Sequence, residues 1–269
     1  MIVRTQGDDY LLIRQTDHAV VSGVFARQWG NTVFSRPEPL ESLRLAAAEH
    51  DNGWREWEQR PRLDPITRKP YQFTELPVDE HLAFYQRGIE RVLQQDRYAA
   101  LLVSMHCTGI YCQRYGTDPG LQLKRYSAET ENVVNLSRAR LETQQQRLRE
   151  ELRADARYRN TVEKNVLWAN YKRLQMTDRL SLYFCMAPPN SRSLGPAPLA
   201  DDGRDADWQL EPAGGNKVAI TPYPFCVQPL EIAIPFRSIP RKTYGDDAEF
   251  QETLAQAPEQ FLKFVLCGA

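Results

Sequence analysis

One acidic residue, Asp178, lies inside the strongly apolar stretch LQMTDRLSLYF, residues 174–184. On a helix, Asp178 shares a face with Tyr171, Leu174 and Leu182, so the pattern places it in the protein interior. An ionised carboxylate is costly to bury unless it is paired or binds a metal ion. The chain must therefore fold so that a buried helix brings Asp178 against a partner.

The candidate partners are few, because the chain has only four histidines. All four fall on or beside expected helices in the N-terminal half of the chain. His18 begins the helix expected over 18–30, and His50, followed directly by Asp51, ends the one over 37–50. His81 begins the helix expected over 80–95, and His106 lies within the apolar helix expected over 98–115.

Composition bounds the class of protein. The chain has 269 residues, of which 42% are hydrophobic and 26% charged, with a formal net charge of −1. Such a chain can bury a sizeable core, and its charge argues against nucleic-acid or membrane partners. No apolar run is long enough to span a bilayer, and no signal peptide is evident. Five cysteines without a CxxC pair indicate reduced thiols, so we expect a cytoplasmic protein and allow a homo-oligomer.

The expected fold class is mainly α, as one domain over residues 1–269. A helical core covers about 16–185 and includes a polar helix over 127–153 with a narrow apolar stripe. Residues 1–15 read as a β-hairpin, and 217–225, 230–236 and 261–267 read as strands. We expect the hairpin and these strands to form a small sheet, with the segment 186–269 packed on the helices. The Pro/Gly/Asp-rich stretch 187–215 reads as a loop.

In chain order the candidate ligands resemble those of the HD superfamily, whose helical core binds metal through the pattern H…HD…D. Here that pattern is formed by His18, His50-Asp51 and Asp178. Two-metal members add two histidines between the HD pair and the last Asp, and His81 and His106 lie in that interval. The resemblance covers roughly residues 10 to 185 and implies an HD-like helical core with one or two divalent ions.

A closer resemblance covers the whole chain. The segments TDHAVVSGVFARQWG, EHDNGWREWE, LLVSMHCTGIY, TDRLSLYFC and TPYPF resemble the family catalogued as domain of unknown function 3891. That resemblance supports the fold and supplies no substrate.

The pattern departs from many HD enzymes just after the HD pair, where they carry a basic residue in an HDxxK-like motif that contacts substrate phosphate. In this chain Trp54 occupies that position, and Arg55 follows as the candidate catalytic cation. Trp54 is also a candidate wall of a substrate pocket. Asn170 and Arg173, one and two turns before Asp178, are candidates for the same pocket.

Imidazole and carboxylate ligands together suit Fe, Mn, Zn or Ni and do not distinguish among them. The resemblance implies that His18, His50 and Asp178 hold one ion, that His81 and His106 hold a second, and that Asp51 bridges them. A metal-activated water would then hydrolyse a small phosphate-ester metabolite. Two alternatives stay open: a di-iron oxygenase with the same ligands, and a non-catalytic helical interaction module with a structural metal.

Each candidate also has a simpler interpretation. The HD pair is compatible with a helix C-cap. His18 and His81 are compatible with surface positions, and His106 is compatible with a hydrogen bond in the core. Asp178 is compatible with an ion pair to Arg173 or Arg179. The joint occurrence of these residues in one order favours the metal-binding interpretation.

Overall fold

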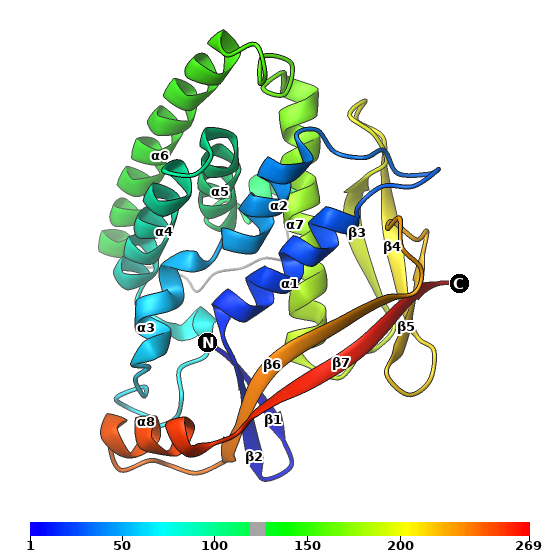
Figure 1. Ribbon diagram of the computed structural model, residues 1–269. Helices are drawn as coiled ribbons and strands as arrows, with labels where there is room; N and C mark the ends of the chain where they lie inside the picture. Colours follow the sequence, from blue (N-terminus) through cyan, green and yellow to red (C-terminus); the bar gives the residue numbers. More distant parts are fainter. Residues whose placement is uncertain (119–126) are drawn as a thin grey trace.

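The computed structural model describes residues 1–118 and 127–269. A group of helices packs against one curled sheet (Figure 1). The helices are α1 (Gln15–Gln28), α2 (Leu40–Glu49), α3 (Arg55–Gln59), α4 (Val78–Leu93), α5 (Arg97–Ile110), α6 (Ala128–Ala154), α7 (Lys164–Met186) and α8 (Asp247–Gln256). Short 3-10 turns are η1 (Asn52–Trp54), η2 (Phe73–Glu75) and η3 (Gln113–Gly116). The strands are β1 (Ile2–Gln6), β2 (Asp9–Ile13), β3 (Arg192–Pro198), β4 (Asp205–Pro212), β5 (Lys217–Thr221), β6 (Leu230–Pro240) and β7 (Glu259–Gly268).

The sheet joins the two ends of the chain. Its seven strands lie in the order β1-β2-β6-β7-β5-β4-β3, and every neighbouring pair is antiparallel except β5 with β7. The N-terminal hairpin pairs with the C-terminal part through β2 and β6, with Leu12 opposite Arg237. This pairing is the one that the sequence predicts.

The prediction of a mainly α protein with an all-α core and a small sheet is wrong. About 49% of the chain is helical and 21% is strand, and the seven-stranded mixed sheet curls into a half-barrel. The error lies in the stretch read as a loop, which contains β3 and β4. These strands turn Leu194, Trp208 and Leu210 into the core and leave most other side chains exposed. Prolines, glycine and aspartates around those few apolar positions hide the alternation.

Helices α1 and α7 lie on the inner face of the sheet. Phe25 of α1 and Phe184 of α7 pack with Trp208, Ile232 and Phe264 from the strands in one apolar cluster. Further along α7, other side chains join a second cluster with α2, α4, α5 and α6. Helix α7 is therefore buried on both sides, and its buried residues include polar side chains such as Lys172, Arg173 and Asp178.

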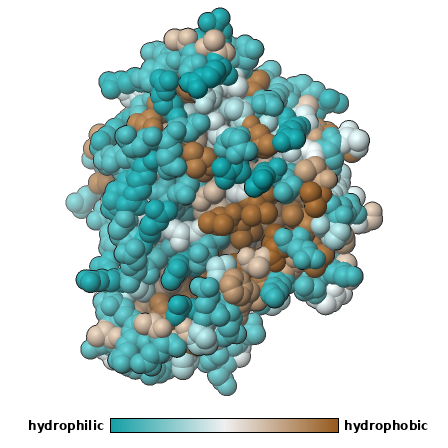
Figure 2. Space-filling view, in the orientation of Figure 1, coloured by the Kyte–Doolittle hydropathy of each residue, from teal (hydrophilic) through white to brown (hydrophobic). Residues whose placement is uncertain are grey.

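Helix α6 is the polar helix of the sequence, and it starts one residue after its N-cap Ser127, which accepts the amide of Thr130. Its buried positions include Val134, Leu141 and Leu148, the stripe that packs mainly against α5. Figure 2 shows that polar side chains cover this helical side, whereas an apolar patch gathers nearer the centre of the view. Among the helices that the structure describes, none has both the length and the apolar character needed to cross a membrane.

Candidate metal centre

The N-terminus of α1 places His18 in the first turn of a buried helix. The helix begins at Gln15, three residues before the expected start, so Asp17 lies in its first turn. The Glu58 carboxylate from α3 accepts the backbone amides of Gln15, at 2.5 Å, and of Thr16. This carboxylate satisfies free amides at the positive end of the helix dipole. It thereby ties α1 to the segment that follows the HD pair.

The HD pair lies where α2 ends against α4. The Asn52 side chain donates hydrogen bonds to the carbonyl oxygens of Glu49 and Gly88, at 2.8 and 3.2 Å. Gly53 lies so close to α4 that a Cβ atom there would be 1.8 Å from the carbonyl oxygen of Phe84. The backbone around His50 and Asp51 is therefore held from both sides.

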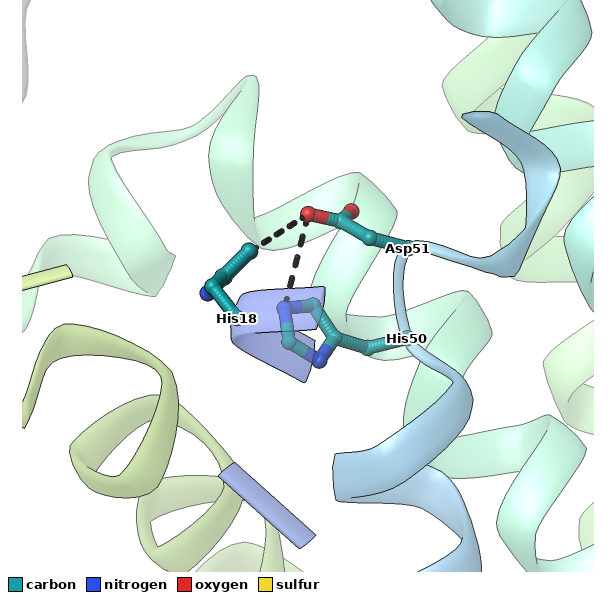
Figure 3. A group of neighbouring side chains, drawn as sticks. All are labelled: His18, His50 and Asp51. Atoms are coloured by element: carbon teal, nitrogen blue, oxygen red, sulfur yellow. Dashed lines mark hydrogen bonds and ion pairs between the residues drawn. The ribbon is translucent and has the colours of Figure 1, made fainter. Parts of the chain in front are cut away.

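Four of the predicted ligands, His18, His50, Asp51 and Asp178, converge in the interior, and Figure 3 shows the first three of them. His18 Nε2 lies 2.9 Å from Asp51 Oδ2. His50 Nε2 lies 3.6 Å from Asp51 Oδ2 and 3.6 Å from Asp178 Oδ1. None of the four residues is more than 4% exposed. Two imidazoles and two carboxylates thus face one another in the protein interior.

Each imidazole is oriented by a hydrogen bond on its other nitrogen. His50 Nδ1 donates to the carbonyl oxygen of Ala47, at 2.8 Å. His18 Nδ1 pairs with the hydroxyl of Ser181, at 2.7 Å. The bond to Ala47 leaves Nε2 of a neutral His50 as a lone-pair donor, and among the described residues this buried nitrogen has no hydrogen-bond partner.

The charges of the cluster are strongly coupled. Burial opposes protonation of His50, but the neighbouring Asp51 and Asp178 carboxylates outweigh it and raise its pKa to about 9. Burial also opposes ionisation of the two carboxyls, but His50 beside Asp51 and Arg114 beside Asp178 hold both pKa values below the ordinary range. Both carboxylates are therefore anionic at neutral pH.

His106 joins the cluster from α5, since His50, His106 and Asp178 form a second group of potential ligands. Its Nδ1 lies 3.0 Å from the side-chain nitrogen of Gln175, and its Nε2 lies 3.4 Å from the hydroxyl of Tyr85. Burial lowers the pKa of His106 to about 3 and keeps the ring neutral. A neutral imidazole is the form that binds metal.

His81 is brought to the neighbourhood but is outside both ligand groups. Its Nδ1 pairs with the hydroxyl of Tyr111, at 2.5 Å, and its ring packs edge-on against Tyr85 and Trp54. The structure therefore does not place it as a partner of His106 around an ion.

Two neighbours of the carboxylates are absent from the sequence-based set. The Tyr85 hydroxyl donates to Asp51 Oδ1, at 2.8 Å, and burial raises its pKa well above 10, so it stays protonated. Arg114 Nη2 donates to Asp178 Oδ2, at 2.8 Å. Arg114, rather than Arg173 or Arg179, is thus the ion-pair partner of Asp178. Tyr85 falls one turn after His81, a spacing that could have suggested it, whereas nothing in the sequence pointed to Arg114.

The other predicted site residues lie elsewhere. Arg55 is half exposed and pairs with Glu49 at the surface, so it does not supply a cation to the cluster. Trp54 is buried against Phe84 and His81 but does not line the cavity described below.

Asn170 and Arg173 have structural contacts instead of the predicted pocket role. Asn170 donates to the carbonyl oxygen of Glu38 and to Tyr98, and Arg173 donates to Asp201 and Ser35. The two side chains tie α7 to α5 and to loop residues, and neither lines the cavity described below. Their helical spacing from Asp178 was therefore a misleading signal.

A cavity of about 180 Å³ reaches the cluster. Its buried part includes His18, Asp51, His106 and Asp178. Its remaining lining residues are Gln15, Phe73, Thr74, Leu76, Val78, His81, Tyr85, Ile110, Tyr111, Arg114 and Leu182. The arrangement can bind a cation at the closed end and a small molecule next to it.

These features define an α/β half-barrel protein with a buried histidine and carboxylate cluster at the end of a small cavity. The chain belongs to the family described as protein of unknown function (DUF3891), whose model matches residues 1–241. Comparisons with curated proteins and with solved structures gave no match. The resemblance to this family of unknown function is confirmed, whereas the resemblance to the HD superfamily stays a prediction, so the activity must be argued from the site.

Proposed function

We propose that this protein is a metal-dependent hydrolase that uses one divalent ion, held by His18, His50, Asp51 and Asp178, to cleave a small phosphate ester. The order of these ligands resembles the HD superfamily pattern. Fe, Mn, Zn and Ni all suit this donor set, which combines imidazole nitrogens with carboxylate oxygens.

The observation that carries the proposal is the position of His50 Nε2. This buried nitrogen lies between two anionic oxygens at 3.6 Å each and has no hydrogen-bond partner among the described residues. Buried polar atoms are normally hydrogen-bonded, but His50 Nε2 meets the two carboxylates only as ion pairs, through the proton that its raised pKa keeps on the ring. A cation bound in place of that proton, between His50 Nε2 and the oxygens of Asp51 and Asp178, would coordinate all three atoms.

The same nitrogen supports one ion rather than two. Both groups of potential ligands contain His50, and its Nδ1 is occupied by Ala47. A single lone pair on Nε2 can bind only one ion. The Tyr85 hydroxyl donates a hydrogen bond to Asp51 Oδ1, the oxygen that a second ion would need as a ligand. These contacts favour a one-metal hydrolase over the two-metal oxygenase alternative.

The site is built for reaction rather than for structure alone. Structural metal sites are closed by their ligands, whereas catalytic sites keep a position open. Here His18, Asp51 and Asp178 all line the cavity, so a substrate can approach them. When bound, a divalent ion lowers the pKa of its water and supplies a nucleophile near neutral pH. Ser181, Ala47 and Tyr85 keep His18, His50 and Asp51 oriented, which is the role of outer hydrogen bonds at metal sites.

Metal stoichiometry tests the proposal. Wild type, His50→Ala and His81→Ala are purified without chelator, reconstituted separately with Zn²⁺, Mn²⁺ and Fe²⁺, and measured by mass spectrometry. We expect one ion per chain in wild type and in His81→Ala, and none in His50→Ala. Hydrolysis of p-nitrophenyl phosphate should follow the metal content. A wild type that binds no metal contradicts the proposal, and one that binds two ions, with His81→Ala keeping one, contradicts the assignment of a single ion.

A further inference from the structure

Arg114 has a guanidinium nitrogen that no residue in the described part of the chain accepts a hydrogen bond from. Its Nη2 donates to Asp178, but its Nη1 has no hydrogen-bond partner among the residues that the structure describes. The side chain is only 7% exposed and lines the cavity beside the metal cluster. A buried guanidinium N–H without an acceptor is costly, and because Arg114 lines the cavity, a small turn of its guanidinium offers this N–H to an anion that enters there.

The backbone around Arg114 has a strained conformation, and this conformation holds the side chain beside the cavity. Gln113, Arg114 and Tyr115 have φ angles of 53°, 51° and 55°, although left-handed conformations are unfavourable for residues other than glycine. Hydrogen bonds from Thr117 to the Arg114 carbonyl oxygen and between Tyr115 and Thr108 hold the turn. Such strain persists where the surrounding structure imposes it, often at ligand sites.

The rest of the cavity wall is mostly apolar. Beyond the cluster it is lined by the side chains of Phe73, Leu76, Val78, Ile110 and Leu182. Its volume of about 180 Å³ is below the range of roughly 300–1,000 Å³ that is usual for ligand sites. The cavity therefore suits a small molecule with an apolar body.

We propose that the substrate is a phosphate monoester of a small apolar alcohol, with its phosphate on Arg114 Nη1 and its alcohol part against this apolar wall. The inference rests on the proposed function, because the phosphate must lie beside the metal ion. With a divalent ion in place, Arg114 and the ion outweigh Asp51 and Asp178 by one positive charge, which an anionic substrate neutralises. Asp118 also lies close to Arg114, but it lies equally close to Arg179. The charges of Asp118 and Arg179 offset each other and leave this balance unchanged.

Calorimetric titration of metal-loaded protein with two stable phosphonates tests the inference. Hexylphosphonate should bind at least tenfold more tightly than methylphosphonate, since burying each extra methylene is favourable. Arg114→Gln should weaken hexylphosphonate binding at least tenfold, because a charge-assisted hydrogen bond is lost. Arg114→Lys, which keeps the charge and the pairing with Asp178, should lose less. Circular dichroism and metal content are measured on every variant.

The matched control is Arg179→Gln. This change removes a cation that also lies near Asp118 but does not line the cavity, so phosphonate affinity should change less than threefold. Metal-loaded wild type that binds both phosphonates equally, or a folded Arg114→Gln variant with unchanged affinity, overturns the inference and leaves the metal site standing. A wild type without metal overturns the proposed function and this inference together.

Discussion

Tyr85 shows at the scale of one residue how the site depends on atoms outside the ligand set. Its hydroxyl holds the Asp51 oxygen that does not face His18, and its ring separates His81 from His106. Removing the hydroxyl frees the Asp51 carboxylate to rotate and leaves one of its buried oxygens without a donor.

We predict that Tyr85→Phe keeps the fold but lowers metal affinity about 10–100-fold, the usual cost of losing an outer hydrogen bond at a metal site. Competition with a chromogenic chelator measures the affinity. Tyr98→Phe is the matched control, because Tyr98 is equally buried but bonds to Asn170 and to the Thr161 carbonyl oxygen instead of the cluster. Equal affinities for the two variants would show that the Tyr85 hydroxyl has no part in metal binding.

At the scale of elements, the packing of η1 on α4 sets the position of the HD pair. Gly53 allows the two backbones to meet, and Gly88 of α4 lies on the same contact. A side chain between them would push α4 away and move Tyr85 with it.

We predict that Gly53→Ala destabilises the protein by about 1–3 kcal/mol or more, as overpacking in an interior does, and also weakens metal binding. A shift of the urea unfolding midpoint reports the first effect. Gly245→Ala serves as control, since its added Cβ would meet only the flexible carboxylate of Glu249. Similar midpoints for both variants would show that the close approach at Gly53 is not needed.

At the scale of the whole molecule, the proposed ion would connect segments far apart in the chain. Its ligands come from α1, from the end of α2 and from α7, and α7 also packs on the sheet that joins both chain ends. A ligand that binds only the folded state stabilises it by mass action.

Removing metal with a chelator should therefore lower the Tm of the wild type. At a metal concentration of about 100 times Kd the loss is roughly 2.7 kcal/mol, or about 5–10 °C for a protein of this size. Scanning calorimetry with and without chelator measures it. His50→Ala, which lacks the central ligand, should show the same Tm in both conditions. A wild-type Tm that does not respond to the chelator would mean that no ion contributes to stability.

The sequence alone indicated the candidate ligands and the elements that carry them. A carboxylate in an apolar helix needs a partner, and the resemblance to the HD pattern set Asp178 with His18, His50 and Asp51. In the structure His50 lies between Asp51 and Asp178, and His18 contacts Asp51. The strand-like runs at both chain ends likewise predicted a sheet that joins them, and β2 pairs with β6 in the structure. The burial patterns within each helix and strand are local, because residues that share one face lie two to four positions apart.

Only the tertiary structure decided the rest. Arg114 reaches Asp178 from a left-handed turn that no periodicity marks, and His81 is kept apart from the ligands by a ring on its own helix. Trp208 and its strand become part of a seven-stranded half-barrel because the sheet supplies hydrogen-bond partners and an apolar face that the Pro-rich segment cannot specify by itself. Such contacts depend on how distant segments pack, and that packing cannot be read from neighbouring residues.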